Sequence, residues 1–118
     1  MTGVTTSPVG EVAERHRRGE IQLVDVRTIE EWEGAHVPGA RHVPIETITA
    51  EPDGFDRSQP VVFYCRAGDR SASVAQAFAA SGWDATSLDG GILGWREQGQ
   101  PIEPEDGEIG ESSGLPPA

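Results

Sequence analysis

The stretch that most restricts the possible folds of this chain is residues 61–73, where an apolar run leads through a glycine-containing loop into a helix-forming run. Val61–Tyr64 has the β-branched and aromatic residues of a short buried strand, and Pro60 precedes it. From Ser71 onward the residues favour a helix. A strand, a tight loop and a helix in this order are typical of an α/β sheet, whose ligands bind at the carboxyl ends of the strands. Cys65, the only cysteine, lies at that position.

The residues around Cys65 favour a reactive thiol. A lone cysteine is more often a small buried hydrophobe with an inert sulfur, and that is the alternative interpretation. A thiolate, however, is stabilised by a helix amino terminus, by converging backbone N–H groups and by nearby arginines. Residues 66–71 offer all three, with Arg66 and Arg70 as the cations, and Gly68 provides the backbone freedom of a tight loop. We therefore expect chemistry at Cys65.

Four motifs follow one another along the chain. They are Asp25-Val26-Arg27 with Glu31-Trp32, His36-Val37-Pro38-Gly39-Ala40, the loop Cys65-Arg66-Ala67-Gly68-Asp69-Arg70-Ser71, and Gly90-Gly91-Ile92-Leu93-Gly94-Trp95. In this order they resemble the signatures of the rhodanese-like sulfurtransferases, whose active-site loop has the pattern Cys-Arg-x-Gly-x-Arg-Ser. The resemblance covers roughly residues 5–99.

The resemblance implies a thiosulfate sulfurtransferase that works by double displacement. The Cys65 thiolate attacks the outer sulfur of a small anionic donor such as thiosulfate, sulfite leaves, and a cysteine persulfide remains. An acceptor such as cyanide, a small thiol or a protein thiol then removes that sulfur. This chemistry needs no metal and no organic cofactor. The residues expected to bind the donor and the persulfide are Arg66, Ala67, Gly68, Asp69, Arg70 and Ser71.

Asp25 and Arg27 are the supporting residues, at the end of a buried strand predicted over residues 21–26. Two roles stay open for Asp25. It caps its own loop, or, as the resemblance implies, it holds an arginine of the Cys65 loop. Thr28 followed by Glu31 predicts a capping box for a short helix, with Trp32 as its core anchor.

The three histidines do not suggest a metal site. His36 and His42 lack a suitably spaced third ligand, so zinc is not expected. His36 is interpreted as structural, in a turn that leads into the next strand. His16 is interpreted as a solvated surface residue of the first helix.

The remaining patterns alternate between strands and helices. They predict an α/β fold with a mostly parallel sheet of about five strands and helices on both faces. We expect one rhodanese-like domain over residues 1–100 and a disordered acidic, Pro- and Gly-rich tail over residues 101–118. The predicted strands are residues 4–6, 21–26, 40–43, 61–64 and 83–88. The predicted helices are residues 8–19, 28–33, 71–81 and 92–98. Ser7 is expected to cap the first of these helices.

Charge and hydropathy exclude several classes of partner. The 118 residues include nine arginines, no lysine and 20 acids, which give a net charge of −11 and make nucleic acid an unexpected partner. There is no run of about 18 apolar residues to span a membrane, and the start lacks the features of a secretory signal. A single cysteine forms no internal disulfide, so we expect a cytoplasmic protein. The oligomeric state is open.

Three alternatives to a free-standing sulfurtransferase are compatible with a cysteine in such a loop. Cysteine phosphatases of related fold use Cys-x5-Arg, whereas four residues separate Cys65 from Arg70 and position 71 is serine. The shorter loop suits one sulfur atom better than a tetrahedral phosphate. A non-catalytic regulatory module, which rhodanese-like domains become when their cysteine is lost, is disfavoured by Cys65. A sulfur relay to a specific protein acceptor uses the same chemistry and stays open.

Overall fold

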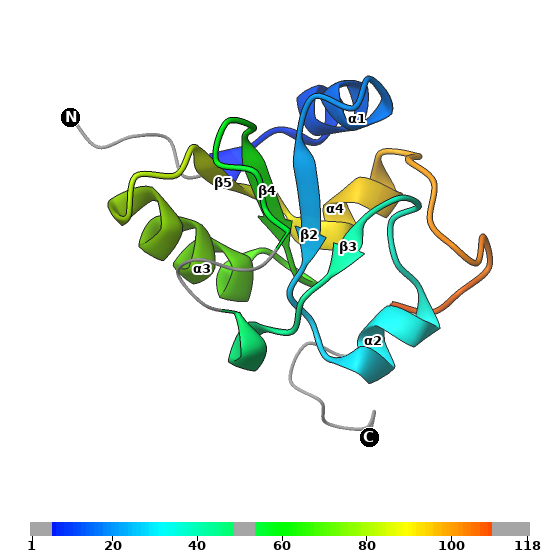
Figure 1. The fold of residues 1–118 in the computed structure, drawn as a ribbon. Coiled ribbons are helices and arrows are strands. Elements are labelled where there is room, and N and C mark those ends of the chain that lie inside the picture. The colour runs from blue at the N-terminus through cyan, green and yellow to red at the C-terminus, as the bar shows by residue number, and fades with distance from the viewer. Residues whose placement is uncertain (1–5, 49–53, 110–118) are drawn as a thin grey trace.

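The computed structural model describes residues 6–48 and 54–109, which form a sheet covered by helices on both faces (Figure 1). The sheet order is β1-β5-β4-β2-β3, and every strand pair is parallel. The predicted α/β fold with about five strands is confirmed. The strands are β1 (Thr6–Ser7), β2 (Gln22–Asp25), β3 (Arg41–His42), β4 (Val61–Tyr64) and β5 (Ala85–Leu88).

Four α-helices occur in the described residues, α1 (Val9–Arg17), α2 (Ile29–Gly34), α3 (Asp69–Ala80) and α4 (Gly91–Glu97), with a 3-10 turn at Ile45–Thr47. Side chains of α1 and α4 share one apolar cluster and side chains of α3 another, so these helices lie on opposite faces (Figure 1). Leu23 and Val62 join the first cluster, whereas Val24 and Phe63 join the second. This alternation explains why the central strands are apolar on both faces. No described helix is long and apolar enough to cross a membrane.

The order of the strands places the carboxyl ends of β2 and β4 next to each other. The chain leaves β2 toward β3 on one side and leaves β4 toward β5 on the other. Asp25 pairs with Tyr64 at the ends of these two strands. Ligands of α/β sheets bind at such a reversal of strand order, outside the carboxyl ends. Cys65 follows Tyr64 directly, so the topology places it at that position.

The observed helix boundaries differ from the predicted ones by one or two residues, and the starts of α1 and α3 show a physical reason. Ser7 was expected to cap the first helix, but it lies in β1 and its hydroxyl hydrogen-bonds with the Thr86 hydroxyl at 2.7 Å. Pro8 is the N-cap residue of α1 and makes no side-chain cap. Helix α3 begins at Asp69, two residues earlier than predicted. Gly68, the N-cap residue, has a left-handed backbone that turns the chain directly into the helix. The capping box of Thr28 and Glu31 is confirmed. The start of the predicted strand 4–6 lies outside the described residues.

The predicted tail is wrong over residues 101–109, which pack against the domain. Ile102 is 8% exposed and belongs to the cluster of α1 and α4. The backbone N–H of Glu103 donates to the His36 carbonyl at 2.7 Å, and the N–H of His36 donates back at 2.9 Å. The indole N–H of Trp95 donates to the carbonyl of Pro101 at 2.7 Å. The acidic composition of this segment suggested a solvated tail, but Ile102 and Ile109 provide apolar contacts with the cluster. Residues 110–118 lie outside the described residues.

Candidate active site

Cys65 lies in a cradle made by residues 66–68 and the first turn of α3. Its side chain is fully buried. Three donors converge on Sγ: the backbone N–H of Gly68 at 3.1 Å, the backbone N–H of Ser71 at 3.4 Å and the Ser71 hydroxyl at 3.4 Å. Of the six loop residues predicted from the sequence, Gly68 and Ser71 are the two that donate hydrogen bonds to the sulfur. Donors placed in this way stabilise negative charge on a sulfur atom.

The conformation of Gly68 directs its N–H to the sulfur. Its φ of 112° lies in the left-handed region, which residues with a side chain rarely adopt. The loop then turns directly into α3, and Ser71 points its backbone and side-chain donors at Sγ. The glycine singled out in the sequence is thus required by the backbone of the cradle.

Ser71 hydrogen-bonds with Ser87 of β5, which is not among the site residues predicted from the sequence. The two hydroxyl oxygens are 2.7 Å apart, and both side chains are buried. A hydroxyl has one proton to donate. When Ser87 donates to Ser71, the Ser71 proton is free for Sγ. No local signal marks Ser87, because the contact depends on β5 lying beside β4.

Backbone N–H groups in the amino-terminal turn of α4 hydrogen-bond with carbonyls of the Cys65 loop. The N–H of Ile92 donates to the Cys65 carbonyl at 2.9 Å, and the N–H of Leu93 donates to the Arg66 carbonyl at 3.1 Å. A Cβ on Gly91 would lie 2.6 Å from the Cys65 carbonyl oxygen, closer than real Cβ contacts allow. The Gly90-Gly91 pair is therefore more than a turn, because Gly91 admits the close approach of α4 to the loop.

Arg70 is bound by Glu31 of α2. Its Nη1 and Nη2 donate to the two carboxylate oxygens at 2.9 and 3.0 Å. Burial raises the pKa of Glu31, but the hydrogen bonds from Arg70 and from the Thr28 backbone outweigh it, so the pKa lies below its ordinary value. The same hydrogen bond raises the pKa of Arg70. Glu31 was predicted only as part of a capping box, and its role toward Arg70 was missed.

Asp25 binds Arg27, its neighbour two residues on. The carboxylate accepts from the backbone N–H of Arg27 at 2.8 Å and from its guanidinium at 2.7 Å, and neither side chain is exposed. These contacts are those of a local cap, the first of the two roles left open for Asp25, whereas Arg70 of the Cys65 loop is bound by Glu31. Burial lowers the pKa of Arg27, but its hydrogen bond and attraction to Asp25 raise it above the ordinary value. Arg27 also lies 5.7 Å from the ring centre of Tyr64, directly before Cys65.

The histidines have structural contacts. His36 and His42 both stack on Trp32, with ring centres 3.7 and 5.0 Å from it. Trp32 is half-buried and belongs to neither apolar core cluster, so it is not the core anchor that was predicted. His16 hydrogen-bonds through Nε2 to the Pro38 carbonyl at 2.8 Å, so it is not merely solvated. Within residues 6–48 and 54–109, no group of three or more His, Cys, Asp or Glu side chains could hold a metal ion.

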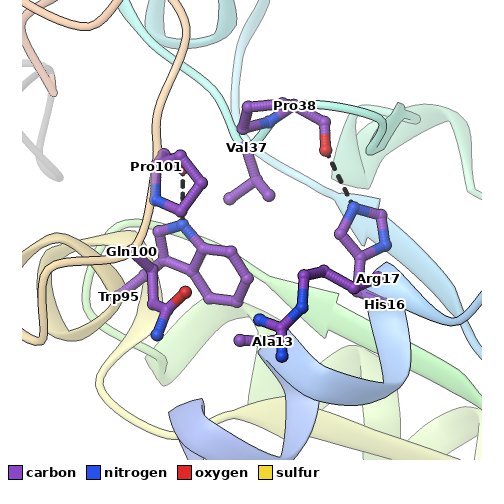
Figure 2. Close-up of a pocket in the computed structure, with 8 residues that line it drawn as sticks. All are labelled: Ala13, His16, Arg17, Val37, Pro38, Trp95, Gln100 and Pro101. Atoms are coloured by element: carbon purple, nitrogen blue, oxygen red, sulfur yellow. Dashed lines mark hydrogen bonds between the residues drawn. The ribbon is translucent and has the colours of Figure 1, made fainter.

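A cavity of about 250 Å³ lies on the α1 and α4 side of the molecule (Figure 2). Its lining includes Ala13, His16, Val37, Trp95 and Pro101, and it is mostly apolar. Residues of the Cys65 loop do not line it, so we do not assign it to the same site.

A family model described as the rhodanese-like domain matches residues 8–98. The chain belongs to this family. The matched range includes the Cys65 loop and all four motifs that carried the resemblance.

Three curated relatives share part of this rhodanese-like domain. The HTH-type transcriptional regulator Rv0324 of Mycobacterium tuberculosis is 32% identical over 95 residues, which are 79% of this chain and 42% of the regulator. MoeZ of the same species, described provisionally as an adenylyltransferase/sulfurtransferase, is 35% identical over 70% of this chain and 22% of MoeZ. YtwF of Bacillus subtilis, described provisionally as a sulfurtransferase, is 30% identical over 70% of this chain and 80% of YtwF. The chain therefore spans less than half of the first two relatives.

Solved structures have the same fold. A rhodanese-like domain protein of Staphylococcus aureus superposes with a TM-score of 0.71 at 29% identity, over 92% of this chain and all of that one. RPA3614 of Rhodopseudomonas palustris superposes with a TM-score of 0.72 at 26% identity, over 85% of each chain. Its function is described as unknown, with tyrosine phosphatase raised as one option.

Arg66 is the second cation of the loop in this rhodanese-like domain. Its side chain is half-buried, and its Nε is buried without a hydrogen-bond partner in the part of the chain that the structure describes. Arg70, in contrast, has both terminal nitrogens engaged by Glu31. The two arginines grouped together by the sequence therefore differ in their contacts.

Proposed function

We propose that this rhodanese-like domain transfers a sulfane sulfur, from thiosulfate or a similar donor, to a thiophilic acceptor through a persulfide at Cys65. The observation that carries the proposal is the convergence of the Gly68 and Ser71 donors on Sγ. The family match and the relatives with sulfurtransferase names support the reaction type.

The reaction has two displacements at sulfur. The Cys65 thiolate attacks the outer sulfur of thiosulfate and forms a new S–S bond, while the original S–S bond breaks and sulfite leaves with its electron pair. The product is a Cys65 persulfide anion. The Gly68 and Ser71 donors, already directed at Sγ, stabilise the negative charge before and after the transfer.

We assign different tasks to the two arginines. Arg66, whose half-buried side chain places a positive charge directly after Cys65, attracts the anionic part of the donor. Arg70 is fixed by Glu31 and shapes the loop, adding positive potential at its rim. Ala67 and Asp69 line the mouth of the cradle as exposed residues.

The acceptor comes from outside the chain. Cys65 is the only cysteine, so no second thiol of the same chain can resolve the persulfide as a disulfide. The acceptor is a small thiol or a protein thiol in the cell, and cyanide serves in an assay. A reducing, cytoplasmic setting is part of the proposal because it keeps Cys65 as a thiol.

The test is persulfide formation followed by intact mass. After incubation with thiosulfate, the wild-type chain is expected to gain one sulfur atom, which cyanide or dithiothreitol removes. Cys65→Ser, close in size to the original residue, is expected to keep the fold and to gain no sulfur. A wild-type chain that forms no persulfide and hydrolyses aryl phosphates above the Cys65→Ser control would refute the proposal in favour of the phosphatase alternative.

A further inference from the structure

The cavity on the α1 and α4 side has an apolar floor and a polar rim (Figure 2). Ala13, Val37 and Trp95 form the floor and are buried. Arg17 and Gln100 stand at the rim, the first exposed and the second partly exposed. An apolar enclosure with a few polar groups along its edge is typical of sites that bind small organic molecules.

Two hydrogen bonds between separate segments hold the walls of the cavity in place. The Nε2–H of His16 donates to the Pro38 carbonyl at 2.8 Å and joins α1 to the turn before β3. The indole N–H of Trp95 donates to the Pro101 carbonyl at 2.7 Å. Because this N–H is the only polar atom of the indole, the rest of the ring presents carbon to the cavity. Walls fixed in advance reduce the ordering cost of binding a ligand.

The rim carries positive charge, although the whole chain is strongly acidic. None of the described residues that line the cavity is acidic, whereas Arg17 and His16 are basic. Arg17 contacts one carboxylate oxygen of Glu14, and Arg18 contacts the other at 2.8 Å. Two guanidinium groups thus share one carboxylate, which leaves net positive charge beside the cavity. Both ion pairs are exposed and therefore weak, so a second carboxylate can bind Arg17.

We infer that this cavity binds a small aromatic carboxylate. Its volume of about 250 Å³ exceeds the volume of about 150 Å³ that encloses benzene in a protein core, so there is room for a bicyclic ring. The ring packs against Trp95, since pairs of aromatic rings attract one another beyond the area that they bury. The carboxylate accepts from the Arg17 guanidinium, which compensates its charge at the open side of the cavity.

Gln100 provides a second donor for the same carboxylate. Its backbone N–H donates to the Trp95 carbonyl at 3.1 Å, which fixes the residue beside the ring. Its side-chain amide has no hydrogen bond with any described residue. In Figure 2 this amide and the Arg17 guanidinium both turn toward the space in front of Trp95. The site is separate from the Cys65 loop and goes beyond the proposed function.

The test uses indole-2-carboxylate as the probe, indole-2-carboxamide as its neutral counterpart and acetate as an anion without a ring. Calorimetry on the full chain measures the dissociation constants, and NMR shifts of backbone amides and of the Trp95 indole N–H locate the site. Arg17→Gln removes the charge, and Ala13→Leu fills part of the cavity. Arg96→Gln is the charge-matched control, because Arg96 is exposed next to Trp95 but does not line the cavity.

Indole-2-carboxylate is expected to bind the wild type and Cys65→Ser equally, with a dissociation constant of about 1 mM or below. The carboxamide should bind the wild type about fivefold more weakly, and Arg17→Gln should weaken binding of the carboxylate alone by a similar factor. Arg96→Gln should match the wild type, Ala13→Leu should lose both indole probes, and acetate should not bind at the cavity. If urea denaturation shows that Ala13→Leu does not fold, the exposed Arg17 variant and the neutral probe decide the test.

Three results would overturn the inference. Equal affinities of the wild type for the carboxylate and the carboxamide would show that the cavity does not select an anion. Shifts confined to Gly68 and Ser71 would place the probe at the Cys65 loop instead. A Trp95 signal that changes with protein concentration without a probe, or Overhauser contacts from its ring to residues 110–118, would mean that a second copy or the chain's own end fills the cavity. Persulfide formation at Cys65 is measured separately, so the proposed function stands or fails independently of these outcomes.

Discussion

At the scale of single residues, two glycines and a serine pair determine what the Cys65 sulfur meets. Gly68 directs its own N–H to Sγ through a left-handed backbone, and Gly91 lets α4 approach the loop from behind. Ser87 fixes Ser71, whose hydroxyl and N–H complete the set of donors. The chemistry proposed for the thiol thus depends on neighbours that carry no charge.

Gly91→Ala tests the close approach of α4. Gly91 has a φ of 63°, and a Cβ would lie 2.6 Å from the Cys65 carbonyl. The variant is expected to unfold at lower urea concentration and to lose most of its persulfide formation. Gly99→Ala is the matched control, because Gly99 has a φ of 80° but open space around its Cβ. Gly99→Ala should lower the free energy of unfolding only by the cost of a side chain at positive φ, about 1 kcal/mol. Equal losses of unfolding free energy in both variants would contradict a steric role for Gly91.

At the scale of elements, the ion pair of Glu31 and Arg70 joins α2 to the start of α3. The capping box fixes Glu31 on the first turn of α2, and its carboxylate then reaches both terminal nitrogens of Arg70. The position of the loop thereby depends on a helix that follows β2, on the other side of the reversal in strand order. This contact couples the fold of the first half of the chain to the geometry of the site.

Glu31→Gln is expected to destabilise the fold in a pH-dependent way. Although burial raises the pKa of Glu31, the bonds from Arg70 and Thr28 lower it overall. A depressed pKa contributes stability that is present above the ordinary carboxyl pKa and is lost as the pH falls through the folded-state pKa. The difference in unfolding free energy between wild type and Glu31→Gln should therefore be largest near neutral pH and shrink toward about pH 3.

Urea denaturation at both pH values measures this difference. Glu30→Gln is the control, since Glu30 is exposed on the same first turn and has the same position relative to the helix dipole. It should show little pH-dependent difference. A Glu31→Gln deficit that is constant from neutral to acidic pH would mean that the carboxylate charge is not what stabilises the contact.

At the scale of the whole molecule, residues 101–109 close one end of the apolar cluster between the sheet, α1 and α4. Ile102 joins that cluster, Glu103 pairs with His36, and Gly34 approaches the Glu108 carbonyl so closely that a Cβ would lie 2.6 Å from it. This segment belongs to the folded unit, although its composition is that of a solvated tail.

Ile102→Ala is expected to reduce the free energy of unfolding by about 2 kcal/mol, because it removes buried methyl groups from that cluster. Persulfide formation at Cys65 should survive in the fraction that stays folded. Ile29→Ala provides the comparison, since Ile29 is 47% exposed and its truncation should change stability by less than about 0.5 kcal/mol. Similar urea midpoints for wild type and Ile102→Ala would show that the segment contributes nothing to the fold.

The sequence by itself determined the elements whose signals are local. The apolar run Val61–Tyr64 predicted β4 with its observed limits, and Thr28 with Glu31 predicted the capping box. The glycine and arginines that follow Cys65 predicted a loop that turns into a helix and directs donors at the sulfur. Each of these inferences uses residues within a few positions of one another, where propensity and hydrogen bonding decide the backbone.

The tertiary structure alone decided which distant groups complete the site. Glu31 lies 39 residues from Arg70, and Ser87 lies 16 residues from Ser71, so their contacts depend on how the strands are ordered in the sheet. Asp25 forms its ion pair with the nearby Arg27. No pattern in the sequence distinguished this ion pair from a contact with an arginine of the Cys65 loop. The docking of residues 101–109 likewise required an apolar cluster that exists only after the sheet and helices have assembled. Local propensities carry no information about such contacts, because their energy comes from burial and charge pairing between separately formed elements.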